Sequence, residues 1–223
     1  MIRLSPRLAC IASLIPPAEC LADIGCDHGR LDAHLLQSGR AARVIASDIS
    51  TVSVEKARSL LTKCGLSDRC SFRVGDGLSV LKAGEADVIV LAGLGGPEIL
   101  DILSAPVNAF YVLQPQNLVP QVRQSLTQRG LFIEDEAICQ DRGRYYEVMR
   151  LKAGEMRLNA LEAEFGPVNL TRRTPALRAL QEQKLRLAEH WLNKLKDAHT
   201  PKALGDRAAW EEKRALYRAL KWD

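Results

Sequence analysis

Residues 21–31, LADIGCDHGRL, combine residue types that could bind a ligand or take part in catalysis. An apolar run ends at Asp23, and Asp27 and His28 follow between Gly25 and Gly29. Three interpretations fit this stretch: a nucleotide-binding loop, a metal or catalytic cluster, or an ordinary turn. Glycines favour the first, because they let the backbone approach a ligand where a Cβ atom would clash.

Acidic residues and glycines also follow three other apolar runs. Asp48 follows RVIAS, Asp76 follows CSFRV within a Gly-Asp-Gly turn, and Gly93 follows DVIVLA. Ligands of open α/β sheets bind at the carboxyl ends of the strands, where a carboxylate can accept hydrogen bonds from ribose hydroxyls. Together these positions predict a site for an adenosine-bearing cofactor. Taken singly, Asp48 could cap the next helix and Asp76 could lie in a simple turn.

The spacing of the first loop distinguishes among adenosine cofactors. A dinucleotide-binding turn has the pattern G-x-G-x-x-G and holds a pyrophosphate at a helix N-terminus, whereas this chain has D-x-G-x-x-x-G. Asp23 and Asp27 would repel a pyrophosphate and attract a cation. S-adenosylmethionine joins adenosine to a sulfonium and an ammonium group, so the acidic loop favours this cofactor. The sequence has no Walker-type phosphate loop, which disfavours NTP hydrolysis.

Asp27 and His28 are also candidates for a catalytic pair. The four histidines, at 28, 34, 190 and 199, and the absence of a C-x-x-C pair give no zinc-site spacing, so we expect no metal. No G-x-S-x-G elbow supports a hydrolytic triad. His28 could cap a helix or brace the loop. Asp27 could lie beside the methionine moiety of the cofactor or beside a target base.

Apolar runs and helical segments alternate over the first two thirds of the chain. We predict strands over residues 20–24, 43–47, 70–74, 87–92 and 109–113, and a final antiparallel hairpin over 131–138 and 145–150. Helices are expected over residues 6–15, 29–38, 54–64, 97–104 and 119–128. Continuous apolar strands are typical of a parallel sheet buried on both faces. The predicted fold class is therefore α/β, a doubly wound sheet with right-handed crossovers.

The character of the sequence changes after residue 151. Residues 174–198 and 206–222 are rich in Leu, Ala, Lys, Arg and Glu, and Thr200-Pro201 and Gly205 interrupt the pattern between them. We predict two domains, 1–151 and 152–223, the second containing a pair of long antiparallel helices. Residues 1–150 hold 16 Lys and Arg against 17 Asp and Glu, and residues 151–223 hold 15 against 10. The basic helices fit either a polyanionic partner or an ordinary solvated surface.

Length and composition limit the classes of protein to which this chain can belong. The 223 residues are 47% hydrophobic, which is enough for a sizeable core. No stretch approaches 18 uncharged apolar residues and the N-terminus has no long apolar run, so we expect neither a membrane span nor a signal peptide. The six scattered cysteines do not resemble a disulfide framework. We therefore expect a cytoplasmic protein, and we expect it to be a monomer.

Several blocks of the sequence carry a resemblance to a known family. They are LADIGCDHGRL, IASDI at 45–49, VGDGL at 74–78, DVIVLAGLGG at 87–96, LQPQN at 113–117 and EFGPVNL at 164–170. With them the chain resembles, over almost its whole length, the bacterial tRNA (adenine-N1)-methyltransferases that modify adenine 22. The family commonly has Ala-Tyr-Leu-Pro at residues 29–32, Met at 94 and Gln-Pro-Asn within 114–117, where this chain has GRLD, Leu and QPQN.

The resemblance implies a Rossmann-like class I methyltransferase domain, a C-terminal coiled coil, S-adenosylmethionine as cofactor and N1 of adenine 22 in tRNA as methyl acceptor. We predict cofactor contacts from Asp23, Gly25, Asp27, Gly29, Asp48, Ile49, Asp76, Gly77 and Gly93. Asp27 and His28 are the candidate catalytic residues. The candidate contacts with tRNA phosphates are Lys184, Arg186, Lys194 and Lys196. Two alternatives stay open: a methyltransferase with another RNA or a non-RNA substrate, and an RNA-binding protein whose cofactor fold has lost turnover.

Overall fold

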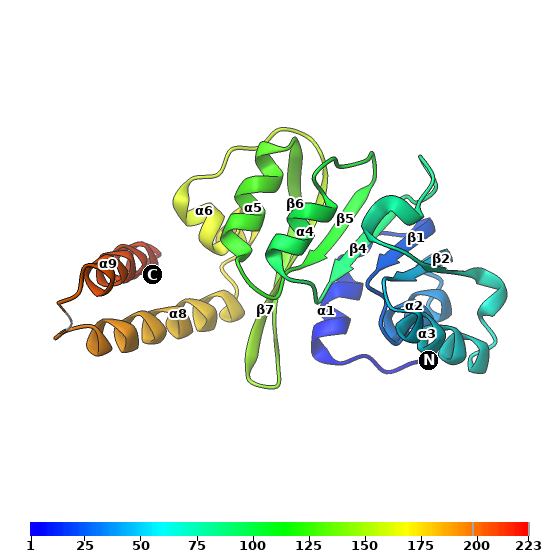
Figure 1. Cartoon of the computed structure of the whole chain (residues 1–223), viewed down its shortest axis with the longest axis horizontal. Coiled ribbons are helices and arrows are strands. Elements are labelled where there is room, and N and C mark those ends of the chain that lie inside the picture. The colour runs from blue at the N-terminus through cyan, green and yellow to red at the C-terminus, as the bar shows by residue number, and fades with distance from the viewer. Residues whose placement is uncertain (198, 223) are drawn as a thin grey trace. The chain divides into compact units, whose positions relative to one another are not determined.

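The computed structural model describes residues 1–197 and 199–222 (Figure 1). The chain forms two compact units, residues 1–157 and residues 158–223. The last strand of the first unit ends at Ala153, slightly beyond the boundary that the sequence predicted. No helix in the described ranges is long and apolar enough to cross a membrane.

The first unit is built on a seven-stranded sheet in the order β3-β2-β1-β4-β5-β7-β6. The five parallel strands are β1 (Ala18–Ile24), β2 (Ala41–Asp48), β3 (Cys70–Val74), β4 (Val88–Ala92) and β5 (Phe110–Gln114). The hairpin of β6 (Leu131–Asp141) and β7 (Arg144–Ala153) completes the sheet, with β7 antiparallel to β5. The predicted α/β class and edge hairpin are confirmed. The strand order reverses between β1 and β4, which is the switch point at which such sheets bind ligands.

Helices cover both faces of this sheet. They are α1 (Pro6–Leu14), α2 (Arg30–Gln37), α3 (Thr51–Lys63), α4 (Gly96–Ile102) and α5 (Val119–Gln128), with short 3₁₀ turns η1 (Ser67–Arg69) and η2 (Gly77–Val80). Side chains of α1, α2 and α3 share one core with Val88 and Val90 of β4. Ile89 and Leu91, on the opposite face of β4, are also fully buried, and α4 and α5 pack against each other over β4 to β6 (Figure 1). Burial on both faces explains why the strands read as continuous apolar runs.

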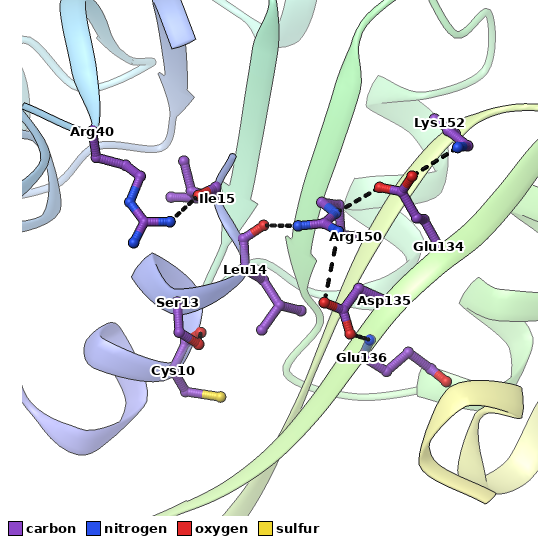
Figure 2. A network of polar contacts seen from close by, with 10 residues as sticks. All are labelled: Cys10, Ser13, Leu14, Ile15, Arg40, Glu134, Asp135, Glu136, Arg150 and Lys152. Atoms are coloured by element: carbon purple, nitrogen blue, oxygen red, sulfur yellow. Dashed lines mark hydrogen bonds and ion pairs between the residues drawn. The ribbon is translucent and has the colours of Figure 1, made fainter. Parts of the chain in front are cut away.

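Helix α1 is fixed to the sheet through its carboxyl end, as Figure 2 shows. Arg150 on β7 donates to the Leu14 carbonyl at 3.1 Å and to Glu134 on β6 at 2.8 Å. Arg40 donates to the Ile15 carbonyl at 2.8 Å. The last carbonyls of a helix have no partner within the helix, so these arginines satisfy groups that would otherwise be unpaired. They also hold the helix that brings Arg7 to the carboxyl edge of the sheet.

The second unit is helical: α6 (Ala160–Phe165), α7 (Pro167–Arg172), α8 (Pro175–Lys194) and α9 (Pro201–Ala219). The pair α8 and α9 is antiparallel, since Gln181 donates to the Tyr217 carbonyl at 2.6 Å while the rings of Trp191 and Trp210 stack at 6.2 Å. The prediction of two long antiparallel helices is thus confirmed, and the coiled-coil packing of the pair stays a prediction. The sequence analysis missed the short helices α6 and α7.

The start of α9 corrects the sequence interpretation. Thr200-Pro201 begins this helix: the Thr200 side chain accepts from the Ala203 amide, and Pro201 is its first residue. Proline is favoured there because the first helical N–H has no partner within the helix. Gly205, which we expected to break the pattern, lies inside α9 with open space around it. A glycine within a helix costs only about 1 kcal/mol, which a long packed helix tolerates.

Candidate cofactor and active site

A cleft of about 510 Å³ lies at the carboxyl ends of β1, β2 and β4. The predicted residues that line it are Asp23, Gly25, Asp27, His28, Asp48 and Gly93. They come from segments far apart in the sequence, and the parallel strand ends bring them together. The cleft is at the switch point of the sheet, as the strand-end pattern predicted.

Asp48 is held in a defined orientation at the end of β2. Its Oδ1 accepts from the Ser50 amide at 2.9 Å, and its Oδ2 accepts from the Asp27 amide at 3.4 Å. Each carboxylate oxygen can accept a further hydrogen bond. The carboxylate therefore braces the turn into α3 and can still accept from the two hydroxyls of a ribose.

The side chains of Asp27 and His28 contact each other in the lining of the cleft. His28 Nδ1 lies 2.7 Å from Asp27 Oδ2, and both side chains are more than half exposed. Asp27 has a φ of +46°, in the left-handed region that is unfavourable for residues with a Cβ atom. Such strain persists only where the surrounding structure imposes it, and it is concentrated at functional sites.

The remaining predicted cofactor residues do not line this cleft. Ile49 and Asp76 are exposed and follow β2 and β3, whose ends are joined by a hydrogen bond from the Gly75 amide to the Asp48 carbonyl at 3.1 Å. They therefore stand beside Asp48 at neighbouring strand ends. Gly77 has a φ of +50° and turns the chain from β3 into η2 against Ile102. Their cofactor contacts stay predictions.

Gly29 has a packing role that the sequence analysis did not foresee. Its φ is +65°, and a Cβ atom there would lie 2.9 Å from both Ala57 Cβ and Leu61 Cδ1 of α3. The glycine therefore allows α2 to start in close contact with α3. Gly25 also has a positive φ, of +87°. A Cβ atom there would lie 3.3 Å from Cδ2 of Leu94, which lines the same cleft, so a side chain would be tightly packed.

A pair of buried carboxyl groups adjoins the cleft. Asp23 is 4% exposed and Asp32 of α2 is 0% exposed, and each carboxyl group affects the pKa of the other. No hydrogen-bond donor in the described part of the chain reaches either side-chain oxygen of Asp32. Burial is the largest cause that raises the pKa of Asp23, to about 7, and it raises the pKa of Asp32 well above its usual range. The raised pKa values mean that this pair keeps a proton at pH values where exposed acids are ionised, and Asp32 was not among the predicted site residues.

The lining of the cleft also includes Arg7 and Gln116, which were not among the predicted site residues. Both donate to Oε1 of the fully buried Gln114 at the end of β5, Arg7 Nη1 at 2.8 Å and Gln116 Nε2 at 3.3 Å. The sequence did carry a signal here, since Gln114 is a polar residue at the end of an apolar strand.

The composition of the cleft fits the predicted cofactor. Three acidic side chains, from Asp23, Asp27 and Asp48, line a space at which Gly25 and Gly93 keep the backbone open, and Arg7 and Arg30 are the arginines of its lining. The acceptors of Asp27 and Asp48 suit adenosine with a cationic centre. No group of three His, Cys, Asp or Glu side chains within the described residues is placed to hold a metal ion.

The candidate RNA-binding residues differ in how accessible they are. The side chain of Lys184 is 18% exposed, and its ammonium pairs with Glu164 and lies 5.6 Å from the Phe165 ring centroid. Arg186 and Lys196 have side chains that are 69% and 70% exposed. Lys194 lies 5.1 Å from the ring centroid of Trp191. Lys184 is thus largely buried within its own unit, whereas Arg186 and Lys196 are exposed and form surface ion pairs, Arg186 with Glu182 at 4.0 Å and Lys196 with Asp197 at 3.8 Å.

Comparison with known proteins defines the class and then the family. Residues 4–149 match the family model described as a methyltransferase domain, so the chain is a methyltransferase-fold protein. A Bacillus subtilis protein, tRNA (adenine(22)-N(1))-methyltransferase, is 36% identical over 159 residues, which are 69% of this chain and 67% of that protein. This chain belongs to the bacterial tRNA (adenine(22)-N(1))-methyltransferase family.

Solved structures agree with this assignment. The crystal structure of the Bacillus subtilis m1A22 tRNA methyltransferase has a TM-score of 0.89 and 28% identity, over 99% of each chain. A Streptococcus pneumoniae protein described as a putative tRNA (m1A22) methyltransferase, solved with S-adenosyl-L-methionine, has a TM-score of 0.82 and 26% identity, over 98% of this chain and 99% of that one. The predicted family, fold class and cofactor are confirmed.

Proposed function

We propose that this chain transfers the methyl group of S-adenosylmethionine to N1 of adenine 22 in tRNA. The observation that carries the proposal is the carboxylate-lined cleft at the switch point, with Asp48 held at the end of β2. Family membership supports the same activity, since the Bacillus subtilis relative is a tRNA (adenine(22)-N(1))-methyltransferase.

The chemistry asks the protein mainly to position two reactants. When bound, S-adenosylmethionine supplies an electrophilic methyl group on its sulfonium. Adenine N1 carries a lone pair at neutral pH, so the protein needs no strong base to activate it. Holding the two reactants in line can lower the barrier by roughly 7–11 kcal/mol.

Asp27 is placed to stabilise the positive charge that develops on the methylated base. Its carboxylate is oriented by His28 at 2.7 Å and lines the cleft. A preorganised opposite charge at the site where charge develops is an effective source of rate acceleration. The backbone carbonyls of residues 93–95, beyond the end of β4, are the second candidate for this role.

The target base must leave any base pair before it can react, because N1 lies on the Watson–Crick edge. The basic helices of the second unit would hold the tRNA through its phosphates, with Arg186, Lys194 and Lys196 as the accessible contacts. We further propose that the chain acts as a monomer in the cytoplasm, without a metal ion.

The test is transfer of labelled methyl from S-adenosylmethionine to unmodified bulk tRNA, followed by nucleoside analysis. We expect label in 1-methyladenosine, lost in Asp48→Ala and retained in Asp101→Ala, an exposed acid on α4 outside the cleft. If the wild-type protein binds the cofactor but transfers no label to tRNA, its substrate is another molecule. If the wild-type protein binds tRNA but not the cofactor, it is an RNA-binding protein without turnover.

A further inference from the structure

The side-chain amide of Gln116 lies at the cleft wall opposite the acidic residues. Its Nε2 donates one hydrogen bond, to Gln114 Oε1 at 3.3 Å, and its backbone amide donates to the Leu94 carbonyl at 2.9 Å. No other protein partner of its side chain is found among the described residues, and the residue is exposed toward the cleft. One N–H and the carbonyl oxygen of this amide are therefore available to a ligand.

The contacts around Gln114 fix which end of the Gln116 amide is the donor. Arginine has only donors, so the Gln114 atom that faces Arg7 Nη1 at 2.8 Å must be the carbonyl oxygen. The Gln116 atom that shares this oxygen must then be the NH₂ group. Gln114 cannot turn over, because it is fully buried and its own NH₂ donates to the Pro115 carbonyl at 2.8 Å.

A fixed donor next to a fixed acceptor matches one edge of adenine. Glutamine pairs in bidentate fashion with adenine N6 and N7, the amide oxygen accepting from N6–H and the amide N–H donating to N7. That pairing leaves N1 unobstructed, whereas pairing through N6 and N1 would block the reacting atom. We propose that Gln116 binds the N6 and N7 atoms of the target adenine and so presents N1 for methylation. This inference rests on the proposed function and names the residue that selects its base.

Gly93 keeps the backbone at this position free of a side chain. A Cβ atom there would lie only 3.1 Å from Arg7 Nη1 and would be in ordinary contact, at 3.7 Å, with Gln116 Nε2. Gly93 follows β4, next to Gly25 and the acidic loop in the same cleft. The base-binding amide and the cofactor-binding carboxylates thus face one shared space.

The arrangement also discriminates against guanine. Guanine presents two acceptors, O6 and N7, on the corresponding edge, so the Gln116 carbonyl oxygen would face an oxygen. Arg7 does not touch the base in this scheme. It is a positioning residue that acts through Gln114, and Arg7→Leu should weaken base selection because it removes the stronger donor to the Gln114 oxygen that Gln116 shares.

The experiment compares two tRNA substrates that differ in one atom of the target base. One carries adenine at the methylated position and the other carries 7-deazaadenine, in which a C–H group replaces N7. We expect the 7-deaza substitution to lower kcat/KM about five- to tenfold more for the wild-type protein than for Gln116→Ala, because only the wild type has a contact to lose. The intrinsic effect of the substitution on N1 is the same for both proteins and cancels in the ratio.

Two further variants test whether the 7-deaza effect is specific to Gln116 and depends on Arg7. Gln121→Ala removes an exposed glutamine of α5 outside the cleft and should retain the full 7-deaza effect. Arg7→Leu should reduce that effect. Gln116→Ala should bind S-adenosylmethionine as the wild type does, which shows an intact fold.

An equal 7-deaza effect in the wild type and Gln116→Ala would overturn this inference alone. Absence of 1-methyladenosine from wild-type reactions with ordinary tRNA would overturn the proposed function and this inference with it.

Discussion

The carboxyl groups of Asp23 on β1 and Asp32 on α2 affect each other's pKa beside the cleft and are almost completely shielded from solvent. Two buried carboxylates cannot both ionise without strong repulsion, so the pair retains a proton at pH values where exposed acids have lost theirs. The pair thus places a group that can gain negative charge next to a site for a cationic ligand.

This pair should make the ligand-free protein less stable as the pH rises. The unfolded chain releases these protons near pH 4, whereas in the folded protein Asp23 holds its proton until the pH nears its raised pKa of about 7, and the pKa of Asp32 is also raised well above its usual range. Between these values the folded state binds more protons, so the free energy of unfolding falls with increasing pH, by roughly 1.4 kcal/mol for each unit of pKa difference. Asp32→Asn should flatten this decline, because the amide can donate to Asp23 without a titrating proton.

Urea unfolding at pH 5 and pH 8 measures the effect, with Asp101→Asn on exposed α4 as the control. Asp32→Asn should gain stability relative to the wild type at pH 8 and gain least at pH 5. Equal differences at the two pH values would show that the pair does not hold the proton.

Gly29 and Gly39 form a matched pair for separating packing from backbone conformation. Both have a positive φ, +65° and +69°, but a Cβ at Gly29 would collide with α3 whereas one at Gly39 would meet nothing within 4 Å. Gly39→Ala should cost about 1–2 kcal/mol from the left-handed conformation alone. Gly29→Ala should cost about 1–3 kcal/mol more, because overpacking is added.

The free energy of unfolding of both variants tests this, together with cofactor affinity under conditions where both are folded. Equal destabilisation would mean that α3 moves aside without cost. If Gly29→Ala and Gly39→Ala are equally stable but folded Gly29→Ala binds the cofactor more weakly, the result would instead favour the cofactor contact of Gly29 that the sequence predicted.

The sequence predicted those features of the site that depend on strand ends. Asp48 and Gly93 could be found because an apolar run stops immediately before each of them, and parallel strands bring their ends together. Asp32 could not be found in this way, since its pairing with Asp23 depends on how α2 packs on β1. The hydrogen bond from Arg7 to Gln114 joins α1 to the end of β5 across 107 residues of sequence, and no local pattern encodes it.

A buried ion network on α5 should matter greatly for stability. The guanidinium of Arg123 is completely buried and lies 2.7 Å from Glu136 and 2.8 Å from Glu147 of the hairpin. These carboxylates hold the pKa of Arg123 above its usual value despite the opposing effect of burial. Arg123→Met should lower the free energy of unfolding by about 3–5 kcal/mol, because it leaves two carboxylates buried without this cation.

The control is Arg58→Met, which removes an arginine that pairs with Glu55 at the surface and lies over the Phe72 ring. Its cost should be about 1 kcal/mol, as is usual for exposed ion pairs and cation–π contacts. Chemical denaturation of the two variants compares them directly. A cost of Arg123→Met no larger than that of Arg58→Met would show that the network relaxes without penalty.

The second unit should contribute to tRNA binding through its exposed cations. The double variant Arg186→Ser, Lys196→Ser removes two cations on exposed side chains that are held only in weak surface ion pairs, and it should weaken tRNA binding while leaving cofactor affinity unchanged. The slope of log affinity against log salt concentration should decrease by about 1 for each phosphate contact that is lost.

Lys184→Ser should behave differently, because its ammonium pairs with Glu164 and lies near the rings of Phe165 and Tyr217. We expect it to lower the stability of the helical unit and to change the salt slope little. The matched control, Lys56→Ser with Lys63→Ser on α3, removes the same number of exposed charges from the other unit. A salt slope that falls equally in the Arg186/Lys196 variant and in this control would mean that tRNA responds to overall charge, and that the helices α8 and α9 hold no particular phosphate.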